Sequence, residues 1–133
     1  MEAPQRVIVG VDTSAESVAA LQWALAAAGA FEGSVTVVHA VGLLEEGGYR
    51  PRPDLAAIVD DARRSVPGAA ASTNLVFEDG PAADVVIRVA EREAADLIVV
   101  GRRGLGQATR LLGSVSEAVL ERSNLPVLIV PSP

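Results

Sequence analysis

The sequence predicts an α/β protein: one parallel β-sheet with helices on both faces. Two observations support this fold. Five short apolar runs recur along the 133 residues, and stretches with helical spacing of apolar side chains separate them. Strands that alternate with helices form parallel pairs through right-handed crossovers, which place helices over the sheet. No linker or internal repeat divides the chain, so we expect a single domain over residues 1–133.

The first half of the chain predicts two strands and two helices. Arg6–Val11 is rich in β-branched residues and predicts a buried strand. Ser14–Ala28 has apolar residues at helical spacing, and Ser34–Val41 predicts the second strand. The glycine- and proline-containing segment Gly42–Pro53 is expected to be a loop, and Asp54–Val66 predicts a more polar helix.

The middle of the chain continues this alternation. Asn74–Glu78 predicts a short third strand near an edge of the sheet. Ala82–Ala94 predicts a helix with valines along one side. Leu97–Val100 is entirely apolar, which is typical of a central strand buried on both faces.

The last third predicts a long loop, a helix and a final strand. Gly101–Leu112 is expected to be a loop containing a short helical turn, and Ser114–Arg122 the last helix. Val127–Val130 predicts the last strand, because Pro126 and Pro131 bracket it where a missing N–H does least harm.

Composition excludes several classes of function. The net charge of −6 argues against salt-driven nucleic-acid binding, and we expect no nucleic-acid partner. The chain has no cysteine and one histidine, which excludes thiolate metal sites and histidine clusters. All 11 basic residues are arginine, so no P-loop or Schiff-base lysine exists. No apolar run is long enough for a membrane span and no signal peptide is recognisable, so we expect a cytoplasmic protein without a membrane partner.

The loop after the fourth predicted strand is rich in glycine and arginine. Glycines let backbone amides approach an anion, and the helix that follows offers unpaired N–H groups. An alternative carries equal weight: Ser114 and Glu117 have the spacing of a capping box, in which Ser114 only caps the helix. The glycines concerned are Gly101, Gly104, Gly106 and Gly113, and the arginines are Arg102, Arg103 and Arg110.

This loop and several other segments resemble the universal stress protein family. GRRG followed by GSVS resembles the family's GxxG…G(S/T) loop. VIVGVDTS, ALQWALAAA, VVHAV, ADLIVVGRRG and LGSVSEAVLERSNLPVLIV occur in the family's order. The resemblance implies a three-layer α/β/α fold with strand order 3-2-1-4-5. The winding then reverses between the first and fourth strands, where ligands bind in such sheets.

The resemblance also implies roles for single residues in binding ATP or another adenine nucleotide. Asp12 would lie near the ribose, and the backbone of Val41 or its neighbour Ala40 near adenine. For Asp12 the alternative is helix capping, but Thr13 and Glu16 have the spacing of a capping box and would already fill the cap. The residues assigned to the phosphates are Gly101, Gly104, Gly113, Ser114, Val115 and Ser116, with Arg103 inside the same motif.

One departure from the family keeps a second hypothesis open. ATP-binding members usually have nine residues between the second glycine and the G(S/T) pair, and this chain has eight, Leu105 to Leu112. One hypothesis is therefore that the protein binds ATP, with or without Mg²⁺. The alternative is that it is a dimeric scaffold that binds no ATP. A nucleotide-hydrolysing enzyme is a further alternative, but VDTSAES lacks the glycine- and serine-rich loop of that class. Without a nucleophile–base pair, we expect at most a weak ATPase.

Three other features give predictions. His39 lies in a buried strand and is expected to be a core or cleft residue, not a catalyst. Trp23 lies on an alanine-rich helix and is expected to pack within the protein. Val127–Val130 carries no charge and would be an edge strand, which predicts a homodimer through antiparallel pairing of this strand with its copy.

Overall fold

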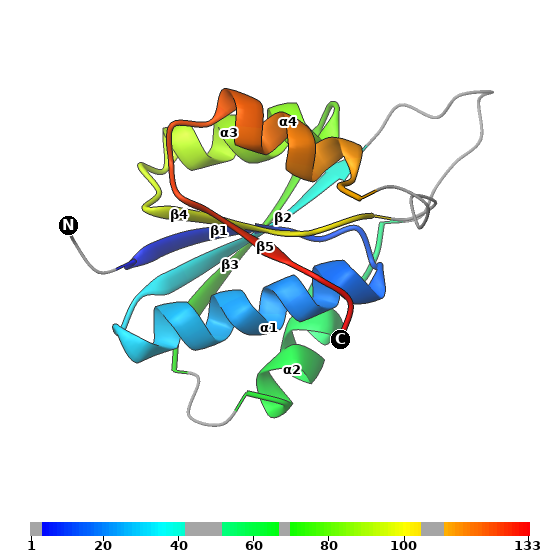
Figure 1. The fold of residues 1–133 in the computed structure, drawn as a ribbon. Coiled ribbons are helices and arrows are strands. Elements are labelled where there is room, and N and C mark those ends of the chain that lie inside the picture. The colour runs from blue at the N-terminus through cyan, green and yellow to red at the C-terminus, as the bar shows by residue number, and fades with distance from the viewer. Residues whose placement is uncertain (1–3, 42–51, 67–69, 105–110) are drawn as a thin grey trace.

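The computed structural model describes residues 4–41, 52–66, 70–104 and 111–133. Five parallel strands form one sheet in the order β3-β2-β1-β4-β5 (Figure 1). The predicted fold class and strand order are confirmed. The strands are β1 (Arg6–Gly10), β2 (Ser34–Val41), β3 (Ser72–Asp79), β4 (Leu97–Gly101) and β5 (Val127–Val130).

Helices cover both faces of the sheet. The chain first builds outward from β1 to β2 and β3, and then returns to place β4 and β5 on the other side of β1. Because every crossover has the same hand, this reversal moves the helices to the opposite face. Thus α1 (Ala15–Ala30) and α2 (Leu55–Arg64) lie on one face, and α3 (Ala82–Arg92) and α4 (Ser114–Arg122) on the other (Figure 1).

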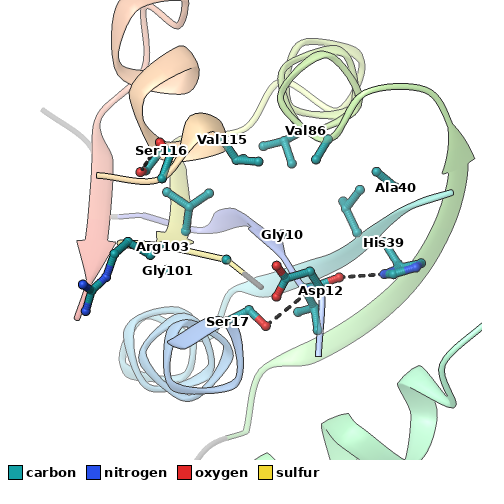
Figure 2. Close-up of a pocket in the computed structure, with 16 residues that line it drawn as sticks. Gly10, Asp12, Ser17, His39, Ala40, Val86, Gly101, Arg103, Val115 and Ser116 are labelled. Atoms are coloured by element: carbon teal, nitrogen blue, oxygen red, sulfur yellow. Dashed lines mark hydrogen bonds between the residues drawn. The ribbon is translucent and has the colours of Figure 1, made fainter. Parts of the chain in front are cut away.

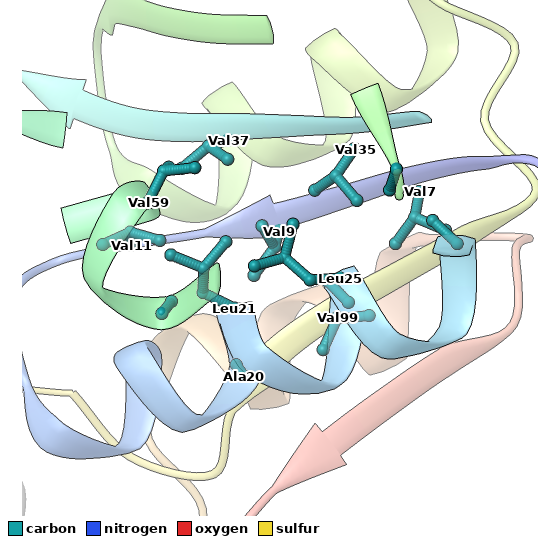
Figure 3. Close-up of a cluster of buried hydrophobic side chains, with 14 of the residues drawn as sticks. Val7, Val9, Val11, Ala20, Leu21, Leu25, Val35, Val37, Val59 and Val99 are labelled. Carbon is teal, nitrogen blue, oxygen red and sulfur yellow. The ribbon is translucent and has the colours of Figure 1, made fainter. Parts of the chain in front are cut away.

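The alternation of side chains along β1 builds two cores. Val7 and Val9 point toward α1 and α2, where they pack with Leu21 and Leu25 (Figure 3). Ile8 points the other way and packs under α3 and α4. A strand buried on both faces needs apolar residues at every position, which is why β1 and β4 were evident as continuous apolar runs.

Several predicted bounds need correction, among them those of α2, which ends at Arg64, α3, which ends at Arg92, and β4, which ends at Gly101. β3 has eight residues, because Ser72–Asp79 pairs along its whole length with β2. The prediction found only its middle, since an edge strand tolerates polar residues at its ends. The first helix continues to Ala30, and β1 ends at Gly10 instead of Val11. The predicted loop 42–53 and the helical turn within 101–112 lie largely outside the described residues.

The prediction that Trp23 packs within the protein is wrong, because this side chain is 58% exposed. The positions of α1 that meet the sheet are Ala20, Leu21, Ala24, Leu25 and Ala28, all fully buried. Helical geometry turns position 23 away from this stripe.

Candidate functional site

A cleft lies where the carboxyl ends of β1 and β4 separate (Figure 2). The chain leaves β1 toward one face of the sheet and β4 toward the other, which opens a crevice at the reversal of winding. The cleft has an empty volume of about 570 Å³, part of it open to solvent. It combines polar groups on one side with an apolar wall on the other.

All but two of the predicted site residues line this cleft. Val41 and Ser114 are not among the lining residues, whereas Ala40, the alternative to Val41, is. The carbonyl of Val41 instead accepts a hydrogen bond from Gly80 N–H at 3.2 Å. The predicted residues that the fold does bring together are Asp12, Gly101, Arg103, Gly104, Gly113, Val115 and Ser116.

A tight turn after β1 places Asp12 in the cleft. Thr13 has a φ of 72°, an uncommon conformation for a β-branched residue. The Asp12 Oδ1 atom accepts from the Ser14 N–H at 3.0 Å and from its hydroxyl at 2.5 Å. Ser14 in turn caps α1, since its Oγ accepts from Ser17 N–H at 3.2 Å. The predicted capping box of Thr13 and Glu16 is therefore wrong.

Two glycines allow the loop after β4 to approach α1 and Asp12 closely. A Cβ atom at Gly104 would lie 2.5 Å from the Asp12 Oδ2 atom, far inside van der Waals contact. At Gly101 a Cβ would lie 3.0 Å from the Glu16 backbone carbonyl carbon. The carboxylate of Asp12 and the backbone of the glycine loop are therefore brought into direct contact.

The amino-terminal end of α4 forms another side of the cleft. Its N-cap is Gly113, not Ser114, and no side chain caps it, so the predicted capping box at Ser114 is also wrong. The helix makes its first backbone bond from Glu117 N–H to Gly113 at 3.0 Å. The N–H groups of residues 114–116 consequently take no part in the bonds of the helix itself, which is the usual arrangement of a helix that receives an anion.

Ser116 fixes this helix end to the loop. Its side chain is buried, and its Oγ lies 2.8 Å from the carbonyl oxygen of Arg102 and 3.0 Å from that of Gly113. A carbonyl only accepts, so the single hydroxyl proton serves these two oxygens. The Ser116 side chain thus positions the start of α4, while its backbone N–H is one of those that the helix leaves unused.

Glu16 is a site residue that sequence reasoning assigned to the wrong role. Its buried carboxylate accepts from the Arg103 N–H at 2.6 Å and from the guanidinium of Arg103 at 3.1 Å. It also accepts from the hydroxyl of Ser132, which follows β5. Glu16 therefore ties the glycine loop and the carboxyl end of the chain to α1, and turns the Arg103 guanidinium toward itself.

These partners change the acidity of Glu16. The hydroxyl of Ser132, together with the amide and guanidinium of Arg103, lowers the pKa of Glu16 although burial acts in the opposite direction. A lowered pKa in the folded state means that the ionised carboxylate stabilises the fold. That contribution is present above the unfolded value of about 4.3 and is lost as pH falls through the folded value.

We expect the Glu16→Gln variant to be less stable than the parent at pH 7, and the two melting temperatures to converge toward pH 3. The amide keeps the shape of Glu16 but not the charge that these donors stabilise. Melting temperatures of both proteins between pH 3 and 7 test this. If the difference between the two melting temperatures is the same at every pH, the assigned role of the Glu16 charge is contradicted.

The other wall of the cleft is apolar apart from one imidazole. The Nδ1 of His39 lies 2.8 Å from the Val11 carbonyl oxygen, so Nδ1 carries the proton. His39 also meets Phe77 edge to face, with ring centroids 6.0 Å apart. His39 was predicted to be either a core residue or a cleft residue, and it lines the cleft. The apolar residues of this wall are Val38, Ala40, Ala82, Val86 and Val115.

Within 4–41, 52–66, 70–104 and 111–133, no three acidic or histidine side chains gather as a metal site would require. In the same ranges, none of the helices has the length and apolar character needed to cross a membrane.

Sequence comparisons match the chain to one family along almost its whole length. The model of the universal stress protein family matches residues 4–131. A universal stress protein of Mycobacterium tuberculosis is 32% identical over 146 residues, which cover 98% of both chains. One of Mycolicibacterium smegmatis is 29% identical over 139 residues, which cover 93% of this chain and 47% of the relative. The chain thus spans about half the length of that relative.

A solved structure shows the same fold. It is a crystal structure of a universal stress protein in complex with cAMP, with a TM-score of 0.75 and 32% sequence identity. The match covers 99% of this chain and 100% of the other.

Proposed function

This chain belongs to the universal stress protein family, and from that premise we propose that its cleft binds an adenine nucleotide, ATP or a related one. The protein would act as a nucleotide-dependent regulatory module. The observation that carries the proposal is the pairing, in one cleft, of the amino-terminal end of α4 and an apolar wall. The relative solved with cAMP supports an adenine nucleotide as the ligand.

The polar side of the cleft fits the phosphates. Phosphate oxygens would accept from the N–H groups at the start of α4, where the helix dipole also favours negative charge. Gly104 brings its backbone close to Asp12, because no side chain stands between them. Arg103 donates its own N–H to Glu16, and we therefore assign it to positioning the loop.

The apolar side fits the base and sugar. A flat purine would lie against Val86, Ala40 and Val115, whose side chains face the cleft (Figure 2). Asp12 lines the same cleft, where its carboxylate could accept from a ribose hydroxyl. The backbone of Ala40 is better placed than that of Val41 to meet the adenine edge, because the Val41 carbonyl is bonded to Gly80.

Hydrolysis, if it occurs, should be slow. The Asp12 carboxylate accepts two hydrogen bonds from Ser14, and His39 directs its Nδ1 proton to the Val11 carbonyl. These bonds make Oδ1 of Asp12 a weaker base and leave Nε2 as the proton-accepting atom of His39, and the slow rate is expected because the sequence offers no nucleophile–base pair. The proposed role is therefore binding, with Mg²⁺ entering, if at all, with the nucleotide's phosphates.

A scaffold that binds no ATP is the second candidate. The observation that favours it is the eight-residue spacing between Gly104 and Gly113, one residue shorter than the ATP-binding members of the family have. One residue spans up to ~3.5 Å, while a phosphate hydrogen bond tolerates roughly a few tenths of an ångström. A shorter loop could thus disfavour a triphosphate and still admit one phosphate.

We expect an adenine nucleotide at about 100 times its dissociation constant to add about 2.7 kcal/mol of stability and raise the melting temperature by roughly 5–10 °C. ATP with Mg²⁺, AMP and cAMP are compared at equal concentration, with GTP as the control. A shift with AMP or cAMP but not with ATP would assign the short loop to a single phosphate. The absence of any shift with all three would leave the scaffold as the function.

Assembly and location complete the proposal. We propose that the protein is a cytoplasmic homodimer that pairs through β5. β5 is an edge strand without charged residues. Antiparallel pairing with a second copy would satisfy the outward backbone groups of such an edge.

A further inference from the structure

The outer face of α1 is unusual among the helices of this protein. α2, α3 and α4 carry charged side chains in ion pairs, such as Arg64 with Asp61. The only charged residue of α1 is Glu16, which is buried. Its solvent side carries alanines and Trp23, which is 58% exposed, and Phe31, which ends the helix, is 46% exposed. A large exposed aromatic side chain on a helix face without charge is typical of a contact surface.

Trp23 lies on the flank of α1 that faces β5. The carboxylate of Glu16 accepts from Ser132, two residues beyond the end of β5, and so marks this flank. Trp23 follows Glu16 by seven residues, or about two helical turns, which returns it to the same side. Ala19 and Ala27, one turn before and after it, are too small to cover the indole. The ring therefore stands beside the open edge of the sheet.

The edge beside Trp23 has free hydrogen-bonding capacity for a partner. The carbonyls of Pro126 and Val130 accept from Ile98 and Arg102, so these positions of β5 face β4. Backbone groups alternate along a strand, which turns those of Val127 and Ile129 outward. Leu128 lies between them and packs on the side of α1.

We infer that Trp23 anchors a second copy of this chain, filling the groove above the seam of two paired β5 strands. The inference rests on the proposed homodimer. It adds a contact of Trp23 with the second copy to the pairing of the two β5 strands. An antiparallel pair of identical edges is related by a two-fold axis perpendicular to the sheet. That axis keeps both copies of α1 on the same face, with their β5 flanks toward each other.

The spacing of the elements makes tryptophan the fitting residue. α1 lies over β1 and β4, its main contacts in the sheet. With strands about 4.8 Å apart, the two copies of α1 would be separated by roughly 15–20 Å across the seam. Helices pack directly at about 8–10 Å, so a groove remains between them. Alanines cannot span it, whereas one indole from each side can.

The charge distribution is compatible with a second copy as the partner. Two molecules with a net charge of −6 repel each other, so self-association needs a contact surface that adds no exposed like charges. β5 has no charged residue, and the one charged residue on this flank of α1, Glu16, is buried and paired with Arg103. A two-fold contact also places Trp23 against the same flank of its copy, which is self-complementary.

Trp23 is the only tryptophan, so its fluorescence reports directly on this contact. The native protein is diluted from about 50 µM while sedimentation measures its dissociation. We expect a blue-shifted emission in the dimer that moves to the red with the same midpoint as dissociation. Trp23→Ala should weaken the dimer by about tenfold or more, as removal of an aromatic anchor does.

Leu75→Ala is the matched control, because Leu75 is an exposed apolar residue on β3 at the opposite edge. It should leave the dissociation constant unchanged. A dimer whose emission stays constant through dissociation would overturn the role of Trp23 and retain the pairing of β5. A protein that is monomeric at about 50 µM would overturn both. The nucleotide-dependent shift in melting temperature is measured separately and tests the cleft alone.

Discussion

Replacing Gly104 with alanine should lower the affinity for an adenine nucleotide by about 100-fold, the loss of one or two charge-assisted hydrogen bonds. The added Cβ would lie 2.5 Å from Asp12 Oδ2, so the carboxylate or the loop must move. Either movement displaces groups assigned to the ribose and the phosphates by more than a hydrogen bond tolerates. Isothermal titration with ATP, AMP and cAMP measures the effect.

The same substitution should cost little stability, since the end of the Asp12 side chain can turn aside. Gly29→Ala is a matched control with the same chemical change within α1, on another part of the molecule. Alanine is favoured over glycine in a helix by up to about 1 kcal/mol, so this variant should be no less stable and should bind normally. An affinity that Gly104→Ala leaves intact would show that the loop and Asp12 do not hold the ligand.

Replacing Ile129 with proline should convert the dimer to a monomer and preserve the fold. Proline removes the backbone N–H, and at position 129 this group faces away from β4. The loss therefore falls on the partner strand and not on the ladder within the sheet. Sedimentation gives the oligomeric state, and circular dichroism gives the helix content.

Leu128→Pro distinguishes the loss of pairing between two β5 strands from the loss of a hydrogen bond within one sheet. Its N–H faces β4, so proline there removes a bond of the sheet and should destabilise the protein by roughly 1–3 kcal/mol. Ile129→Ala controls for the loss of the isoleucine side chain and should remain dimeric. If Ile129→Pro stays a dimer with a native spectrum, the interface lies on another surface.

The sequence determined the layers of this protein. β4 and the inner positions of β1, Val7 to Val9, are apolar because both of their faces are buried, and that pattern is visible in any window of a few residues. The bounds of β5 and α4 were predicted without error, since proline brackets the strand and a glycine precedes the helix. A cleft lies at the carboxyl ends of β1 and β4, beside the motifs around Asp12 and Gly104, and nucleotide binding there stays a prediction.

Tertiary structure alone decided what these residues contact. Glu16 has the sequence signature of a cap, yet it holds Arg103 and Ser132, which are 87 and 116 positions away. Trp23 lies in an apolar helix and still faces outward, because only the packing of α1 on the sheet fixes which side is covered. The spacing of apolar residues indicates which positions of a helix or strand are buried. The residues that a side chain contacts, and the direction in which it points, depend on segments that are distant in the sequence, and the spacing of apolar residues carries no information about them.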